Sequence, residues 1–370
     1  MSALFTPLQL RNVTMPNRIV ISPMCQYSAV DGCATSWHMM HLGHLAVSGA
    51  GMLCLEATAV EAKGSISMRD LGLFNDKTEN ALQPVLAMIR EHSKIPVVIQ
   101  LSHAGRKASV RAPFEGGQLV DLNDGGWMTY APSAVPFKED ERAPIALDDA
   151  GLQRIRDAFV AATHRAARLG IDGIEVHAAH GYLLHQFLSP LSNHRTDEYG
   201  GSLENRLRFP LEIFELVRAA FPASQPVGVR VSATDWVEGG WHVDDTIAFA
   251  QALKTRGVDW IDVSTGGVSP LQKIQLGPGD QVPFAEAVKA ATGVPTMSVG
   301  LITEAQQAED IIASGKADMV ALARGILYDP RWPWHAAAEL GATVTAPPQY
   351  WRSQPATQNG LFGHITQGAR

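Results

Sequence analysis

The sequence predicts a single (β/α)₈ barrel. Short apolar runs rich in β-branched residues recur along the 370 residues, and each is followed by a loop and a longer amphipathic segment. Strands that alternate with helices of this length pair in parallel and are covered by the helices. Eight such units suit a closed barrel, and the G-x-G-x-x-G turn typical of an open, doubly wound sheet does not follow the first strand, which ends at Ile21.

The strands are expected in short runs of four or five residues that are mostly apolar and rich in β-branched residues. In chain order they are Arg18–Ile21, Met52–Glu56, Val97–Leu101, Gly173–His177, Val227–Val231, Trp260–Val263, Thr296–Val299 and Met319–Ala323.

The helices are expected between these strands, where apolar residues recur at helical spacing. They are Thr78–Ser93, Asp148–Leu169, Leu203–Ala220, Asp244–Arg256, Pro283–Ala291 and Glu304–Ser314.

Two long loops interrupt the alternation, over residues 103–147 after the third strand and 178–202 after the fourth. In such barrels the loops that leave the carboxyl ends of the strands build the active site, so both are expected to be functional. Residues 346–370 are rich in Pro, Gln and Gly and are expected to form an extended arm and tail beyond a barrel of residues 1–345.

Composition excludes several classes of protein. Hydrophobic residues make up 46% and charged residues 18% of the chain, with a net charge of −7 and no run of Lys and Arg, so nucleic acid is not an expected partner. Three cysteines without a C-x-x-C pair argue against a disulfide scaffold or an iron–sulfur cluster. Without a signal-like N-terminus or a run long enough to span a bilayer, the protein is expected to be cytoplasmic and not to bind membranes.

The segment from Glu175 to Tyr182 holds the most concentrated reactive chemistry, at the end of the fourth strand. The N–H groups of His177 and His180 can hold an oxygen on which negative charge develops, and the Tyr182 phenol can deliver a proton to carbon. A zinc site is an alternative, because barrel hydrolases also place histidines at strand ends. Asp262 is one further candidate ligand, but the other strand ends supply mostly Gln, Arg and Gly, which favours an organic anion over a metal.

The seventh and eighth strands end in small residues, followed by one arginine. Ser298-Val299-Gly300 and Ala323-Arg324-Gly325 lie where barrels commonly bind a phosphate group through backbone N–H groups and a helix N-terminus.

Polar residues at three other strand ends point to a shared cofactor. Gln100 lies inside an apolar strand and needs a partner for its amide, which a heteroaromatic ring would supply. Arg230 is costly if it is buried alone, so an anion or an electron-rich ring is expected beside it. With the segment Ser22–Tyr27 at the first strand, these groups converge on one barrel mouth.

The sequence resembles the old yellow enzyme family of FMN-containing ene-reductases. Its most specific stretch, from Asn193 to Arg206, reads N-x-R-x-D-x-Y-G-G-S-x-x-N-R and follows H-x-x-H-x-Y at the spacing of the family. The similarity runs from Leu4 to Arg352. Cys25, where other members carry threonine, is similar to the bacterial thermophilic-like branch, also called NADPH dehydrogenase or xenobiotic reductase.

The resemblance implies a role for each of these residues. Tyr182 would be the proton donor, and His177 and His180 would bind the carbonyl or nitro oxygen of the substrate. Tyr27 would line the substrate pocket. The FMN contacts would be Ser22, Pro23, Met24, Cys25, Ala57, Gln100, Arg230, Gly300, Ala323 and Arg324, with Ala323 at a position where the family usually has glycine.

The implied reaction begins when NADPH or NADH reduces FMN. Hydride from flavin N5 and a proton from Tyr182 then reduce an activated alkene: an α,β-unsaturated carbonyl compound, a maleimide or a nitroalkene. The related dienoyl-CoA and trimethylamine dehydrogenases fit poorly, because they carry cysteine-bound clusters and further domains. A flavin-binding paralogue or sensor with little turnover is the alternative from another class.

The resemblance also implies an assembly. In the thermophilic-like branch a C-terminal arginine of a neighbouring subunit reaches into the active site, and Arg352 matches that position. Trp351 precedes it, and tryptophan and arginine are enriched at interface hot spots. A homodimer or a dimer of dimers is therefore expected, with these two residues bordering the partner's substrate pocket.

Overall fold

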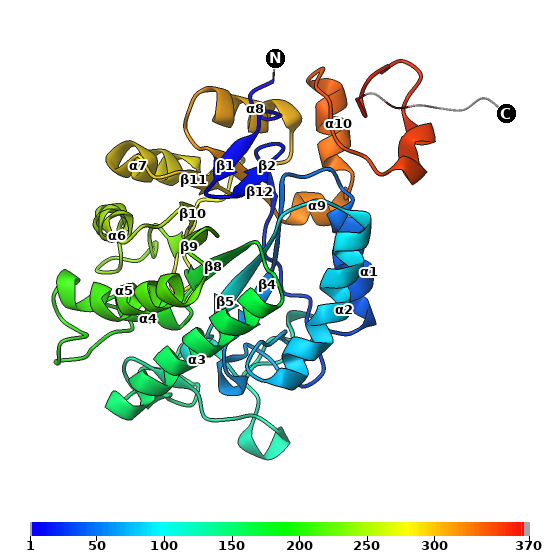
Figure 1. Cartoon of the computed structure of the whole chain (residues 1–370). Coiled ribbons are helices and arrows are strands. Elements are labelled where there is room, and N and C mark those ends of the chain that lie inside the picture. The colour runs from blue at the N-terminus through cyan, green and yellow to red at the C-terminus, as the bar shows by residue number, and fades with distance from the viewer. Residues whose placement is uncertain (1, 364, 366–370) are drawn as a thin grey trace.

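A closed barrel of eight parallel strands forms the centre of the computed structural model, which describes residues 2–363 and residue 365 (Figure 1). The strands follow one another around the barrel in chain order, and the last pairs with the first to close it. The predicted (β/α)₈ barrel is thereby confirmed. Its strands are β3 (Ile19–Ile21), β4 (Met52–Ala59), β5 (Val97–Ser102), β8 (Gly173–Ala178), β9 (Val227–Ser232), β10 (Trp260–Ser264), β11 (Thr296–Ser298) and β12 (Met319–Leu322).

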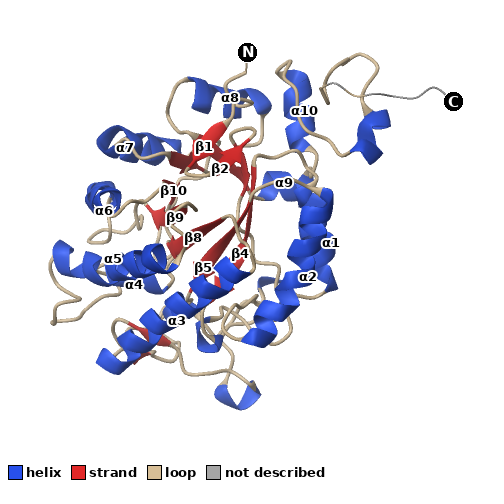
Figure 2. Cartoon of the chain, viewed as in Figure 1, coloured by secondary structure: helices blue, strands red, loops and turns tan. Residues whose placement is uncertain are grey.

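Helices surround the barrel as an outer layer (Figure 2). In α3, for example, an apolar stripe faces inward: Ile155, Phe159 and Ala162 recur at helical spacing and are fully buried. The helices are α1 (Ser36–Ala46), α2 (Asp76–His92), α3 (Asp149–Arg168), α4 (Leu183–Leu188), α5 (Leu203–Ala220), α6 (Val243–Thr255), α7 (Val282–Thr292), α8 (Ala305–Ala313), α9 (Arg324–Tyr328) and α10 (Trp332–Glu339).

A short hairpin closes the amino end of the barrel. Strands β1 (Leu8–Leu10) and β2 (Val13–Met15) pair antiparallel, and Leu10 and Met15 pack against side chains that fill the barrel interior. Apolar closure at this end leaves the carboxyl ends of the strands as the place where polar side chains can meet a ligand.

The two long loops contain little regular structure. The first carries the 3₁₀ turns η2 (Gly105–Lys107), η3 (Pro113–Glu115) and η4 (Leu122–Asp124), and the short parallel pair β6 (Tyr130–Ala131) and β7 (Ile145–Ala146). The second carries α4, all six residues of which are buried. A further 3₁₀ turn, η1 (Ala62–Gly64), follows β4. In the part of the chain that the structure describes, no helix is long and apolar enough to cross a membrane.

The expectation of an extended arm from residue 346 was wrong for the residues that the structure describes. Pro348–Ser353 forms the 3₁₀ helix η5, and the chain then returns so that the Val344 N–H donates to the Leu361 carbonyl at 2.8 Å. The segment packs on α10 at the periphery of the molecule (Figure 1), because its Leu361 and Phe362 form one buried apolar cluster with Trp334 and Ala337 of that helix. We still propose a boundary near residue 345; residues 364 and 366–370 lie outside the described part.

Candidate active site

The predicted histidines and tyrosine meet at the carboxyl end of β8. His177 is the penultimate residue of the strand, and the chain then turns through His180 and Gly181, whose φ angles are +58° and +74°. The His177 ring lies edge-on to the rings of His180 and Tyr182, with centroid separations of 5.2 and 5.0 Å. The left-handed turn therefore gathers the three side chains that the sequence analysis placed in one site.

Both histidines are neutral near pH 7. Burial, and then the charge of Arg230, lowers the pKa of each imidazole well below its ordinary value. Nδ1 of His177 accepts the Ala179 N–H at 3.3 Å, so its one proton lies on Nε2. Nε2 of His180 lies 2.8 Å from Ser264 Oγ. Neutral imidazoles can donate a hydrogen bond to a substrate oxygen without adding a full positive charge to the site.

Tyr182 is held as a neutral phenol beside a cation. Burial raises the pKa of its hydroxyl well above the ordinary value, so it keeps its proton at neutral pH. Lys107 Nζ lies 5.1 Å from the centre of the Tyr182 ring and donates to the carbonyls of His180 and Gly267 at 2.8 and 2.9 Å. Lys107 was not predicted from the sequence, because its position follows from the folding of the loop at η2 rather than from a motif.

Arg230 is buried at the end of β9 and is paired with a carboxylate. Its Nε lies 3.1 Å from Asp262 Oδ2, and its Nη1 lies 3.4 Å from Ser22 Oγ. Asp262, the alternative metal ligand of the sequence analysis, is thus the counter-ion of Arg230. Because Arg230 and Asp262 are neighbours in register on β9 and β10, the pairing follows directly from the strand alignment.

Gln100 has a protein partner that the sequence analysis did not foresee. Its Nε2 donates to Glu175 Oε1 at 2.8 Å, and Trp260 Nε1 donates to the other oxygen at 3.2 Å. The indole reaches Glu175 by crossing Gly228, where an added Cβ would lie 2.0 Å from the ring. Burial, and then Asp262, raises the pKa of Glu175 to about 7. With its nitrogen held by Glu175, the Gln100 amide keeps its oxygen available as an acceptor.

The loop after β3 lies over buried acids. Glu56 of β4 accepts the Gln26 N–H at 2.9 Å, which positions the segment that carries Cys25 and Tyr27. Burial, and then Asp70 and Glu56, raises the pKa of Cys25 well above its ordinary value. The Cys25 side chain is therefore a thiol rather than a reactive thiolate. The predicted contacts Ser22 and Ala57 are buried at the same strand ends, and Pro23 and Met24 are partly buried.

The residues predicted to bind phosphate lie at the ends of β11 and β12. Gly300 has a φ of +111°, and a Cβ there would lie 2.4 Å from Asp280 Oδ1, so no side chain fits. Ala323 is the N-cap residue of α9, whose first residue is Arg324. Ser298 Oγ, at the end of β11, is buried with no hydrogen-bond partner among the described residues. These groups at neighbouring strand ends can receive an anion.

Trp351 and Arg352 are not brought to this site within the chain. Trp351 Nε1 donates to the Ala346 carbonyl at 3.0 Å, and Arg352 is exposed on η5 beside α10. Their predicted place beside the substrate pocket of a partner subunit stays a prediction.

Comparison with known proteins agrees with this geometry. The model of the NADH:flavin oxidoreductase / NADH oxidase family matches residues 3–342. An NADPH dehydrogenase of Geobacillus sp. (strain WCH70) is 46% identical over 351 residues, covering 94% of this chain and 98% of that protein. An NADPH dehydrogenase of Listeria innocua is 43% identical over 355 residues, covering 95% and 99%. The solved structure of morphinone reductase superposes with a TM-score of 0.75 at 27% identity, covering 94% of this chain and 91% of that one.

Proposed function

The chain belongs to the NADH:flavin oxidoreductase / NADH oxidase family, as an FMN-dependent NAD(P)H oxidoreductase of the old yellow enzyme type, and we propose that it reduces activated carbon–carbon double bonds. The substrates proposed are α,β-unsaturated carbonyl compounds, maleimides and nitroalkenes. The observation that carries this proposal is the close packing of two neutral imidazoles and a neutral phenol at the barrel mouth.

The residues at the strand ends fit FMN. The Gln100 amide oxygen is left as an acceptor, and Arg230 offers positive charge to an electron-rich ring edge. Ser22, Pro23, Met24, Cys25 and Ala57 would contact the ring system. Gly300, Ala323 and Arg324 would hold the phosphate, near the partnerless hydroxyl of Ser298. When bound, FMN supplies reversible hydride transfer between the nicotinamide and the substrate carbon.

The histidines would orient the substrate. His177 and His180 would donate hydrogen bonds to the carbonyl or nitro oxygen, and negative charge builds up on that oxygen as the β-carbon is reduced. Because both donors are fixed before the reaction, they stabilise that charge without reorganisation. Tyr27 would line the pocket.

Tyr182 would complete the reaction by delivering a proton to the α-carbon. Its raised pKa keeps the proton in place until a strong carbon base forms beside it. The cation of Lys107 near the ring would stabilise the phenolate left behind.

An assay of NADPH oxidation with cyclohexenone tests this function. The yellow holoprotein should consume NADPH anaerobically beyond one equivalent per flavin only when the enone is present, and this further consumption should yield cyclohexanone in equal amount. A protein that binds FMN and is reduced by NADPH but never transfers hydride to any alkene of the three classes would instead be a flavin-binding paralogue or sensor.

A further inference from the structure

The turn that carries His180 and Tyr182 has a backbone that must be held in place from outside. His180 has a φ of +58°, which is uncommon for a residue with a side chain, and Gly181 follows at +74°. A Cβ on Gly181 would lie 2.1 Å from the Gly267 carbonyl oxygen, so the turn is pressed against the loop after β10. Such conformations persist only where the surrounding structure determines them.

Four different side chains bind the four backbone polar groups of His180 and Gly181. The His180 N–H donates to Ser232 Oγ at 2.9 Å, and its carbonyl accepts from Lys107 Nζ at 2.8 Å. The Gly181 N–H donates to His185 Nδ1 at 2.8 Å, and its carbonyl accepts from Gln186 Nε2 at 2.7 Å. The peptide between the two residues is therefore held at one end by Lys107 and at the other by His185.

The contact with Gly181 fixes the protonation of His185. A backbone N–H can only donate, so Nδ1 must be unprotonated, and the proton of the neutral ring lies on Nε2. Nε2 in turn lies 2.9 Å from Asp235 Oδ1, and both side chains are fully buried. Asp235 thus selects the one tautomer that leaves an acceptor facing the turn.

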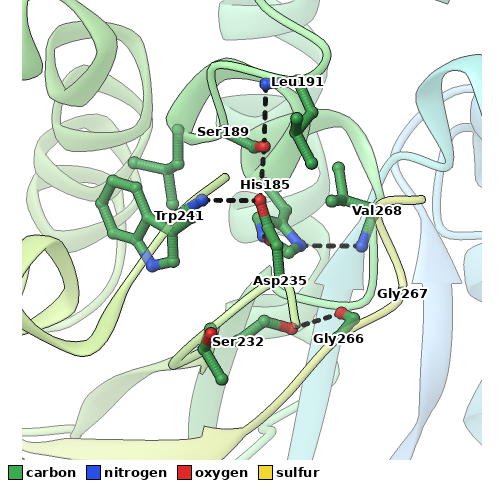
Figure 3. A network of polar contacts seen from close by, with 12 residues as sticks. His185, Ser189, Leu191, Ser232, Asp235, Trp241, Gly266, Gly267 and Val268 are labelled. Carbon is green, nitrogen blue, oxygen red and sulfur yellow. Dashed lines mark hydrogen bonds and ion pairs between the residues drawn. The ribbon is translucent and has the colours of Figure 1, made fainter. Parts of the chain in front are cut away.

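Asp235 is itself held by two further donors, as Figure 3 shows. Ser189 Oγ and the Trp241 N–H donate to its Oδ2 at 2.6 and 2.8 Å. Burial raises the pKa of this carboxyl, and the hydrogen bonds from the His185 ring, Ser189 and the Trp241 N–H oppose that effect by stabilising the anion. Asp235 is therefore an anion with a fixed direction.

We propose that His185 and Asp235 are positioning residues for the reaction. Asp235 fixes the tautomer of His185, and His185 in that tautomer holds the His180–Gly181 peptide. The peptide in turn places the His180 imidazole and the Tyr182 phenol against the substrate. Neither residue touches the reacting atoms. The inference rests on the proposed function, because it assigns His180 and Tyr182 to the substrate.

Two variants of His185 separate the acceptor from the rest of the side chain. His185→Asn and His185→Leu both remove the imidazole and the donor to Asp235, but Asn keeps an oxygen close to the place of Nδ1. The probe is p-hydroxybenzaldehyde, a phenol whose oxygen mimics the oxygen of the enolate. Its binding to each holoenzyme is followed by the long-wavelength charge-transfer band that it forms with the flavin. We expect His185→Leu to weaken binding on the order of 10²-fold, the scale set by small misplacements in a site, and His185→Asn to lose much less. Equal affinities in the two variants, or wild-type affinity in both, would overturn the proposal.

Asp235→Asn tests the tautomer while keeping the shape. The Trp241 N–H needs an acceptor, so the single oxygen of the new Asn side chain must face Trp241. Its NH2 group then faces His185 and donates to Nε2. The ring proton then moves to Nδ1, where it meets the Gly181 N–H. We expect weakened phenol binding in this variant and, against intuition, partial rescue in the double variant Asp235→Asn/His185→Asn, whose residue 185 has an oxygen in any case. A double variant that binds no better than Asp235→Asn would contradict the proposal.

Two controls keep the outcomes distinct. Thr292→Val removes a buried hydroxyl at the other end of the barrel, which donates to the Val288 carbonyl and accepts the Val294 N–H. This variant should be less stable than the wild type but should bind the phenol with the same affinity. ¹⁵N NMR of His185 in the wild-type protein should show a protonated Nε2 and an unprotonated Nδ1. A wild-type holoenzyme that fails to bind any phenol would count against the proposed function, whereas the NMR result bears on the tautomer alone.

Discussion

Burial determines the chemistry of each residue at the barrel mouth. It lowers the pKa values of His177 and His180 and raises that of Tyr182, so all three side chains are uncharged near pH 7. The amine of Lys107 lies close both to the Tyr182 ring and to the His180 carbonyl, to which it donates a hydrogen bond. The division of labour between orienting donors and a proton source follows from these environments.

Tyr182→Phe should separate the two halves of the catalytic cycle. Only reduction of the alkene needs a proton at carbon, so rapid-mixing measurements should show re-oxidation of the reduced enzyme by cyclohexenone slowed by about 10²–10⁴-fold. Reduction of the enzyme by NADPH should change little. If both steps slowed equally, Tyr182 would be a packing residue rather than the proton donor.

We expect Lys107 to set an alkaline limit on alkene reduction. Burial, and then the charge of Arg106, lowers the pKa of Lys107 to about 8, so the amine loses its positive charge as the pH rises through that value. Without the cation the Tyr182 phenolate is less stable, and the rate of alkene reduction should fall above about pH 8. In Lys107→Arg, whose guanidinium stays charged, the fall should be absent. An unchanged pH profile in that variant would assign the limit to another group.

At the scale of the element, the sequence predicts the barrel closely. All eight predicted strands are present with ends within three residues, because strands buried on both faces are mostly apolar along their length. The hairpin β1–β2 and helix α1 were missed. Helix α1 lacks a distinct apolar stripe, and its start is set by a capping box between Thr35 and His38.

The site, like the fold, was predicted only in part. The residues proposed to contact a ligand, such as His177 and Arg230, carry a sequence signal because their polarity interrupts an apolar strand. Residues that hold those side chains in place do not. Lys107 reaches the His180 carbonyl, and Asp235 reaches His185, only after loops from distant parts of the chain have folded. Tertiary contacts of this kind have no local pattern.

Gly228 shows how one strand position serves its neighbours. Trp260 crosses it to reach Glu175, so Gly228→Ala would force the indole and backbone apart. We expect a loss of about 1–3 kcal/mol in the free energy of unfolding, measured with urea, as for other overpacked cores. Gly277→Ala is the control, because a Cβ there has nothing within 4 Å. Equal stabilities of the two variants would show that the barrel accommodates the methyl group.

At the scale of the whole molecule, the prediction concerns the assembly of several copies of the chain. The C-terminal segment is attached to α10 of its own chain, and Arg352 remains exposed at its surface. In a homodimer or dimer of dimers, Arg352 and Trp351 would border the substrate pocket of the partner. Arg352→Ala should then raise the KM for bulky enones at unchanged FMN content. A monomer with full activity at assay concentration, established by light scattering, would refute this arrangement.

The central claim is that His177 and His180 bind the oxygen on which charge develops in the reduced alkene. It is tested most directly by mixing reduced enzyme anaerobically with cyclohexenone and following flavin re-oxidation in a single turnover. In the variant His177→Ala/His180→Ala, loss of two hydrogen bonds of roughly 1.5–3 kcal/mol each should slow re-oxidation by at least about 10²-fold, while FMN remains bound. Re-oxidation at the wild-type rate in that variant would contradict the account.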